Sequence, residues 1–306
     1  MQYIIGIDLG GTFIKLGLLN SRYQIKDRVV LDTTDFSGKG ALIQGIADFI
    51  ISFISEHNLQ RKDILGVGLG LPGPIDSQGG CVRYLPNIPG WNNVPLRSIL
   101  SEKIKLPVFI DNDANLMTLA EYKIGAARGS ANAVCITLGT GVGGGLIIQG
   151  KLYRGSTFAA GEVGHMPINE DGPLCNCHGH ACLERYIGNR RILSYAKEVF
   201  KNDISLERLS ALAAKGNVKA KKVWQDIGKK TGIALTSVVN LLNPDCIVIG
   251  GGVANAGKIL FDSIEDTIKS RAMATQAQHV KIAKAELGDD GGIIGAAILV
   301  KQKGLA

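Results

Sequence analysis

The chain has 306 residues, 45% of them hydrophobic and 20% charged, which is typical of globular proteins and predicts two domains that fold without disulfides. The formal net charge is +7, and lysines are densest between Lys215 and Lys230. Apolar Val223, Trp224 and Ile227 recur among these lysines at helical spacing, which indicates a solvated helix face. We therefore expect no nucleic-acid partner.

The first predicted element is a β-hairpin. An apolar run ends at Asp8, a glycine turn spans residues 9–12, and a second apolar stretch continues to Leu19. Backbone N–H groups of such a turn suit a phosphate, although glycines also simply permit tight turns. Asp8 is a candidate partner for Mg²⁺ through water, and the alternative is a turn-forming acid.

Strand and helix patterns then alternate, as in an α/β domain. The expected strands are Ile64–Leu71 and Val108–Ile110. The expected helices are Leu42–Ile54, Leu96–Ile104 and Ala114–Ala127. The stretch from Ala41 to Ile54 is too short to cross a bilayer and predicts a core helix. No secretory signal opens the chain, so we expect a cytoplasmic protein with no membrane partner.

A second hairpin repeats the first. The apolar positions of residues 5–9 recur at residues 134–138, and each set is followed by glycine, at Gly10 and at Gly139. This repetition predicts a duplicated chain. A further strand begins at Cys246 and ends in a glycine turn, and a final helix is expected from Gly291 to Val300.

Two segments, Gly68–Gly73 and Gly139–Gly144, match GxGxxG. Neither is followed by a helical pattern, because Pro74-Ile75-Asp76 follows the first and strand-like residues follow the second, so a dinucleotide fingerprint is excluded. No GxxxxGK[ST] occurs, which excludes a Walker-type NTPase.

Eight motifs distributed over the whole chain resemble those of the ROK family of sugar kinases and repressors, within the actin-like ATPase superfamily. These motifs are DLGGT from Asp8, LPGPID from Leu71, PNIPGW from Pro86, NDAN from Asn112, LGTGVGGG from Leu138, GEVGH from Gly161, CLE from Cys182 and IGGG from Ile249.

The resemblance implies a duplicated actin-like ATPase (ribonuclease H-like) α/β fold with two lobes and a central cleft for ATP and sugar. We expect an N-terminal lobe of residues 1–113 plus 291–306. Residues 114–290 would form a C-terminal lobe with a zinc-binding loop and a dimerisation surface. By the same resemblance we expect a homodimer or a dimer of dimers.

The resemblance also implies the residues of a kinase site. Asp113 would be the general base, although an acid at the start of a helix can equally be an N-terminal cap. The expected sugar-binding residues are Gly73, Asn87, Asn112, Asp113, Glu162, His165 and Glu184. The expected ATP-binding residues are Asp8, Gly10, Gly11, Thr12, Lys15, Gly139, Thr140, Gly141, Gly250, Gly251 and Gly252. Trp91 could cover the sugar or be a core residue.

Three of the six cysteines crowd together, which indicates a metal rather than a disulfide framework. The resemblance implies a structural Zn²⁺ on His165, Cys175, Cys177 and Cys182, four protein ligands that close a tetrahedral site. In the family this loop has the sequence pattern CxCGxxGCxE, whereas this chain has His178 and Ala181 in place of the two glycines.

We therefore expect an ATP-dependent, Mg²⁺-requiring kinase that phosphorylates a hexose hydroxyl, first of all that of glucose to give glucose 6-phosphate. N-acetylglucosamine, N-acetylmannosamine and other hexoses remain alternatives. A non-catalytic sugar-sensing regulator is the alternative of another class. We disfavour it because family repressors place a helix-turn-helix ahead of the DLGGT motif, which begins here at Asp8.

Overall fold

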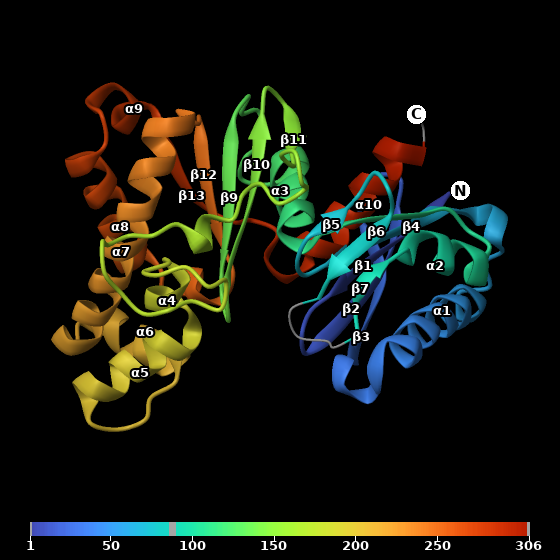
Figure 1. The fold of residues 1–306 in the computed structure, drawn as a ribbon, viewed down its shortest axis with the longest axis horizontal. Helices are drawn as coiled ribbons and strands as arrows, with labels where there is room; N and C mark the ends of the chain where they lie inside the picture. Colours follow the sequence, from blue (N-terminus) through green and yellow to red (C-terminus); the bar gives the residue numbers. More distant parts are fainter. Residues whose placement is uncertain (1, 86–89, 305–306) are drawn as a thin grey trace. The chain divides into compact units, whose positions relative to one another are not determined.

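The computed structural model describes residues 2–85 and 90–304, and the chain folds into two compact units (Figure 1). Unit 1 comprises Met1–Ala120, Arg154–Ala160 and Asp289–Ala306, and unit 2 comprises Glu121–Tyr153 and Gly161–Gly288. Compared with the expected division after residue 113, unit 1 also holds residues 114–120 and the separate segment 154–160.

Unit 1 is built on a five-stranded sheet. In spatial order its strands are β3 (Ile25–Asp32), β2 (Phe13–Asn20), β1 (Tyr3–Leu9), β4 (Ile64–Leu71) and β8 (Val108–Asn112). The first two pairings are antiparallel, whereas β1, β4 and β8 run parallel. The parallel register places Asp8 beside Gly70 and Gly70 beside Asp111, so the carboxyl ends of all three strands share one edge.

Within residues 2–85 and 90–304, four α-helices belong wholly or partly to unit 1: α1 (Gly38–Glu56), α2 (Leu96–Ile104), α3 (Asp113–Ile124) and α10 (Gly291–Gly304). By length and composition α1 alone among the described helices could span a membrane. Its residues Leu42, Ile46, Ile50 and Phe53 are instead buried in the same core as the strands, which confirms the predicted core helix.

Helix α10 packs on the parallel strands at the distance of backbone contact. A Cβ added at Gly6 of β1 would lie 2.2 Å from the carbonyl oxygen of Ile293, and one at Gly68 would lie 2.1 Å from that of Ala296. Gly68 therefore serves close helix packing, and its position inside β4 agrees with the exclusion of a dinucleotide fingerprint.

A small sheet of β5 (Ile75–Asp76), β6 (Cys81–Tyr84) and β7 (Asn92–Val94) completes unit 1. Trp91 immediately precedes β7, is 3% exposed and belongs to the hydrophobic core. The structure thus decides the open question about Trp91 in favour of a core residue.

Unit 2 repeats the sheet of unit 1. Its strands, in spatial order, are β11 (Lys151–Tyr153), β10 (Val142–Ile148), β9 (Ala133–Leu138), β12 (Cys246–Gly250) and β13 (Lys281–Lys284). As in unit 1, the first two pairings are antiparallel and the last two parallel. The equal strand order and directions confirm the duplication predicted from the two hairpins.

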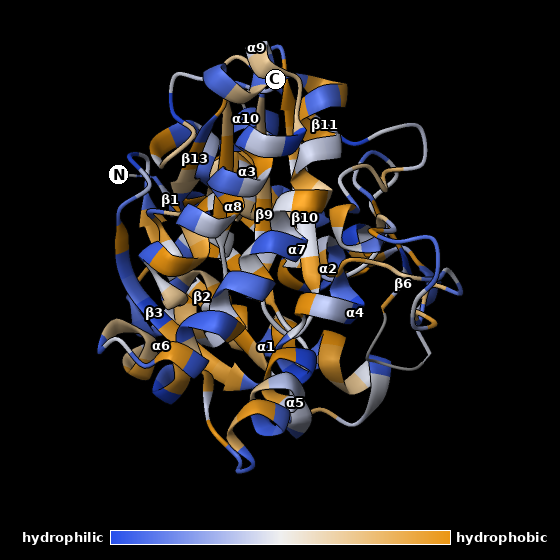
Figure 2. Cartoon of the chain, turned by 90° about the vertical axis from the view of Figure 1, so that its left-hand side faces the viewer, coloured by the Kyte–Doolittle hydropathy of each residue, from blue (hydrophilic) through white to orange (hydrophobic). Residues whose placement is uncertain are grey.

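The remaining α-helices that the structure describes all belong to unit 2. They are α4 (Glu184–Ile187), α5 (Asn189–Phe200), α6 (Leu206–Ala214), α7 (Val218–Leu242), α8 (Lys258–Arg271) and α9 (Ala274–His279). Hydrophobic residues dominate β9 and β10, whereas α7 also carries hydrophilic ones (Figure 2). Trp224 of α7 is fully buried and Lys222 and Lys229 are exposed, which confirms the predicted solvated lysine face. Lys215 lies outside α7, at the end of α6.

Candidate functional site

The first glycine turn of unit 1 is held rigidly between β1 and β2. The Gly10 N–H donates to the carbonyl of Phe13 at 2.8 Å. Thr33 ties the turn from outside, because its hydroxyl donates to the Gly10 carbonyl at 3.1 Å and its N–H to that of Thr12 at 2.7 Å. Thr12 and Gly11 are exposed, so the tip of the turn is accessible to a ligand.

Asp8 is the carboxylate next to this turn. It pairs across the hairpin with Lys15, and a Cβ at Gly292 of α10 would lie 2.6 Å from its Cγ. Burial raises the pKa of the Asp8 carboxyl above its usual value, while Lys15 lowers it and Asp289 raises it further. A partly buried anion of this kind is stabilised by a cation, and the start of α10 beside it also favours negative charge.

The strand-to-helix turn after β8 carries the second group of polar residues. Asn112 ends the strand, and Asp113 is the first residue of α3. The Asn112 side chain donates to the carbonyl of Gly73 at 3.2 Å and accepts the N–H of Asn115 at 3.1 Å. The Asp113 carboxylate accepts the N–H of Ala114 at 2.8 Å.

These two groups lie at one edge of the sheet, because the register puts Gly70 between Asp8 and Asp111. Adjacent strands are about 4.8 Å apart, so the two aspartate-bearing strand ends are separated by about 10 Å. A Cβ on Gly70 would come within 3.5 Å of the Cα of Asp113. Unit 1 therefore brings together Asp8, the glycine turn, Lys15, Gly73, Asn112 and Asp113, whereas Asn87 lies outside the described residues.

Unit 2 presents the matching turn between β9 and β10. The Gly139 N–H donates to the carbonyl of Gly141 at 3.0 Å, and a Cβ on Gly139 would meet nothing within 4 Å. Gly251, with φ of +83°, lies against Leu138, because its Cβ would be 2.3 Å from the Leu138 carbonyl oxygen. The two glycine segments, around Thr140 and at residues 250–252, are thus neighbours at one end of β9 and β12.

Three predicted sugar contacts surround the same turn. Glu184, the first residue of α4, accepts the N–H of Val142 at 2.8 Å, and its Oε2 would lie 2.7 Å from a Cβ on Gly141. The Glu162 carboxylate lies 3.9 Å from Nε2 of His165. Burial raises the pKa of Glu162, His165 lowers it and Glu184 raises it, which places the three side chains in mutual electrostatic range.

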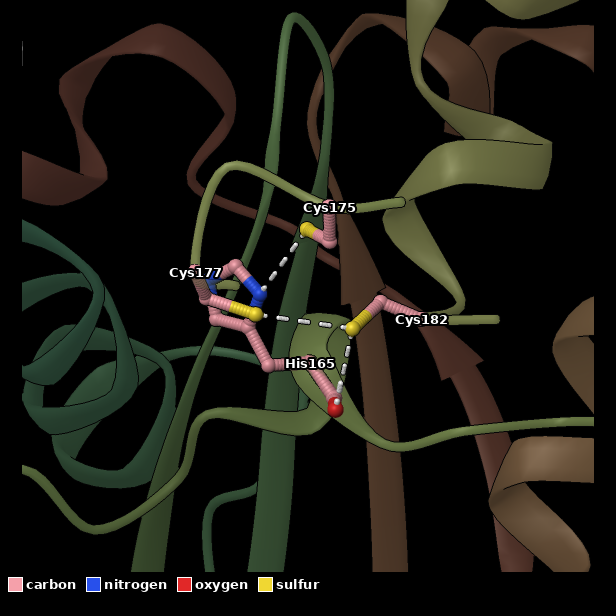
Figure 3. A group of neighbouring side chains, drawn as sticks. All are labelled: His165, Cys175, Cys177 and Cys182. Carbon is pink, nitrogen blue, oxygen red and sulfur yellow. Dashed lines mark hydrogen bonds between the residues drawn. The ribbon is translucent and has the colours of Figure 1, made fainter. Parts of the chain in front are cut away.

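The four predicted zinc ligands, His165, Cys175, Cys177 and Cys182, form one cluster (Figure 3). Their ligand atoms all lie within 4.8 Å of one another. Two separations are 3.6 Å, from Cys175 Sγ to His165 Nδ1 and from Cys177 Sγ to Cys182 Sγ. Tetrahedral Zn²⁺ with Zn–S bonds of about 2.3 Å requires ligand separations of about 3.8 Å, so the cluster has the size of a zinc site.

The two departures from the family loop occupy a strained backbone conformation. His178 has φ of +68° and Ala181 has φ of +55°, the left-handed region in which glycine is unstrained. The loop keeps its shape through the Cys175 N–H to Gly179 carbonyl bond of 2.8 Å and the Ala181 N–H to Pro173 carbonyl bond of 3.1 Å. Neither His178 nor His180 belongs to the metal-sized cluster found among the described residues.

Several residues that build this site were absent from the sequence interpretation. Thr33 fixes the first glycine turn, and Gly292 lets α10 approach Asp8. Arg154 donates from Nε and Nη2 to one oxygen of the fully buried Asp111. Their partners are remote in sequence, so no local pattern indicates them; only the position of Asp111, directly before Asn112, could have drawn attention to it.

The pattern of the ROK family matches residues 4–303. The chain is 36% identical to a glucokinase of Halalkalibacterium halodurans, over 99% of this chain and 96% of the relative. It is 33% identical to a glucokinase of Thermotoga maritima, over 98% of each. It is also 32% identical to a xylose repressor of Caldicellulosiruptor bescii, over 97% of this chain but 77% of the repressor.

Solved structures show the same pattern of similarity. A ROK family glucokinase from Streptomyces griseus, in complex with glucose and AMPPNP, superposes with a TM-score of 0.83 at 30% identity, covering 98% of this chain and 99% of that one. A ROK hexokinase from Thermus thermophilus gives 0.84 at 32% identity, with 99% of each chain covered. By family pattern, sequence identity and the actin-like ATPase fold, this chain belongs to the ROK family.

Proposed function

We propose that this chain is an ATP-dependent sugar kinase that transfers the γ-phosphoryl group to a hexose hydroxyl, with glucose as the substrate tested first. The observation that carries the proposal is the placement of Asp113 at the same sheet edge as Asp8 and the Gly10–Thr12 turn. A candidate base thus lies within one unit beside a candidate phosphate turn. The glucokinases among the relatives support glucose.

Asp113 accepts the proton of the attacking hydroxyl in this proposal. Phosphoryl transfer needs an oriented nucleophile and charge stabilisation more than covalent chemistry. The first turn of α3 presents the Asp113 carboxylate, and Asn112, held by Gly73 and Asn115, is positioned to orient the sugar. Asp113 lies at the N-terminus of α3, where the helix dipole favours a negatively charged side chain, the form that a base requires.

The glycine turns bind the triphosphate through backbone N–H groups. Gly10, Gly11, Thr12 and Lys15 would do so in unit 1, and Gly139–Gly141 with Gly250–Gly252 in unit 2. The residues present also fit Mg²⁺, since the partly buried Asp8 carboxylate beside the phosphate turn offers the oxygen ligands that Mg²⁺ prefers. Bound there, Mg²⁺ neutralises charge that develops on the phosphoryl oxygens.

Glu162, His165 and Glu184 are proposed to bind the sugar hydroxyls. The zinc cluster supports this role: if Nδ1 of His165 held the metal, the imidazole proton would lie on Nε2, the atom that faces Glu162. Burial raises the pKa of the Cys182 thiol to about 12, and zinc binding would displace that proton. Four protein ligands leave no open position, so the zinc is structural.

A sugar-responsive regulator without kinase activity is the second candidate, favoured by the xylose repressor among the relatives. N-acetylglucosamine, N-acetylmannosamine and other hexoses are the alternative substrates. The homodimer or dimer of dimers remains a prediction from the family resemblance, and the cytoplasmic location remains a prediction from the sequence.

Replacing Asp113 by Asn tests the kinase proposal. Assayed with ATP over a panel of hexoses, the wild-type protein should phosphorylate glucose best. Asp113→Asn should bind glucose normally but lose about 10²- to 10⁴-fold in kcat, because the amide cannot accept the proton. Asp203→Asn, which alters an exposed ion pair with Lys197, is the matched control and should keep wild-type kcat. A wild type that binds sugar without turning over ATP would favour the regulator.

Gly139→Val tests the phosphate turn of unit 2. Since a Cβ at Gly139 meets nothing within 4 Å, the variant should fold, and its side chain should obstruct the phosphate. We expect calorimetry to show the ATP affinity reduced by about tenfold or more, which corresponds to a loss of about 1.4 kcal/mol. The glucose affinity should change little. The control is Gly40→Val, at an equally open position on α1. Equal losses for ATP and glucose would show that the turn is structural.

Metal analysis tests the zinc proposal. The purified wild type should contain one zinc per chain, Cys177→Ser should lose it, and Cys81→Ser, outside the cluster, should retain it. Removing zinc with a chelator should lower the thermal stability and weaken glucose binding more than ATP binding. A metal-free wild type with full activity would contradict the site.

A further inference from the structure

The buried ion pair between Arg154 and Asp111 links the candidate base to a distant segment of the chain. Asp111 is fully buried, and Nε and Nη2 of Arg154 donate to its Oδ2 at 2.8 and 2.5 Å. Its other oxygen accepts the N–H of Asn112 at 2.9 Å and the side-chain amide of Asn115 at 3.1 Å. One carboxylate therefore joins Arg154 to both residues that flank Asp113 and Ala114.

Arg154 belongs to a segment with an unusual course. Residues 154–160 are part of unit 1, although Tyr153 before them and Gly161 after them belong to unit 2. The segment folds back on itself, because the Ala160 N–H donates to the Arg154 carbonyl at 3.0 Å. Glu162 and His165 follow within five residues of its end. The Arg154 guanidinium joins this segment to Asp111, two residues before Asp113.

Two features distinguish this pair from an ordinary surface ion pair. The Asp111 side chain is 1% exposed and that of Arg154 21%, so solvent screens the interaction little. The planar guanidinium also fixes direction, which an ammonium group would not do. Arg154 therefore fixes the direction of the Asp111 carboxylate, two residues before the proposed base.

We propose that Arg154 is a positioning residue for the general base: through Asp111 it sets the orientation of the Asn112–Asp113 turn and couples that turn to the segment leading into Glu162 and His165. This inference rests on the proposed kinase function. Arg154 binds the Asp111 carboxylate directly and acts on the turn through it. Misplacing a reacting group by about 1 Å can cost about 10²-fold in rate, so the contribution would appear in kcat.

The test compares kcat and KM for Arg154→Lys, Arg154→Met and the double variant Arg154→Met with Asp111→Asn. The double variant matters because removing Arg154 alone leaves a buried charge unpaired and can impair folding. Positioning predicts that kcat falls about 10- to 100-fold while KM for ATP changes much less, with Lys recovering part of the loss. The double variant should regain thermal stability but remain slow.

Arg28→Met is the matched control, because Arg28 makes an exposed pair with Asp290 in the same unit at 2.8 Å, and its kcat should equal that of the wild type. A double variant that regains stability and kcat together would show that the pair is only structural and overturn the inference. Asp113→Asn in the same assay separates the two claims: if it is inactive while the Arg154 variants keep kcat, only the positioning role fails. A wild type without hexose kinase activity overturns both.

Discussion

The in-register parallel pairing of β1, β4 and β8 is the constraint on which the site in unit 1 depends. It places Asp8 and Asp111 on either side of Gly70, so that a glycine turn and a strand-to-helix turn finish at the same edge. The pairing requires small residues on the inner strand: a Cβ at Gly70 would press on Leu116 at 3.0 Å, and one at Gly68 on α10. The glycines of β4 thus allow α3 and α10 to approach and so fix where Asp113 and Gly292 lie.

Unit 2 has the same sheet arrangement as unit 1, but different side chains lie around its hairpin turn. Its sheet has the same strand order, and its hairpin turn at Gly139–Gly141 corresponds to the turn at Gly10–Thr12. There the carboxylates come from outside the sheet: Glu184 bonds to the Val142 N–H, and Glu162 is associated with His165 of the metal-sized cluster. Duplication therefore supplies two sets of backbone N–H groups, while insertions into the second copy supply the sugar-binding candidates.

Local patterns were sufficient to predict the hairpins, α2 and β4, because apolar periodicity and glycine turns depend on neighbouring residues. They overextended α3, predicted to Ala127 but ending at Ile124, where the buried Glu121 carboxylate accepts the Ala126 N–H and the chain turns. Local patterns did not predict the roles of Thr33 and Arg154. Thr33 bonds to a residue 23 positions away and Arg154 to one 43 positions away, and such distant contacts produce no periodicity in the sequence. Crowding of the cysteines indicated a metal, whereas Gly73, Glu162 and Glu184 were predicted only from the family resemblance, because no local pattern distinguishes them.

The most direct test of this account is a crystal structure of the protein with glucose and a non-hydrolysable ATP analogue. We expect the sugar hydroxyl to be phosphorylated to lie within hydrogen-bond distance of the Asp113 carboxylate, and backbone N–H groups of the Gly10–Thr12 turn to contact the phosphates. A sugar hydroxyl bound away from Asp113, or phosphates that contact neither glycine turn, would contradict it.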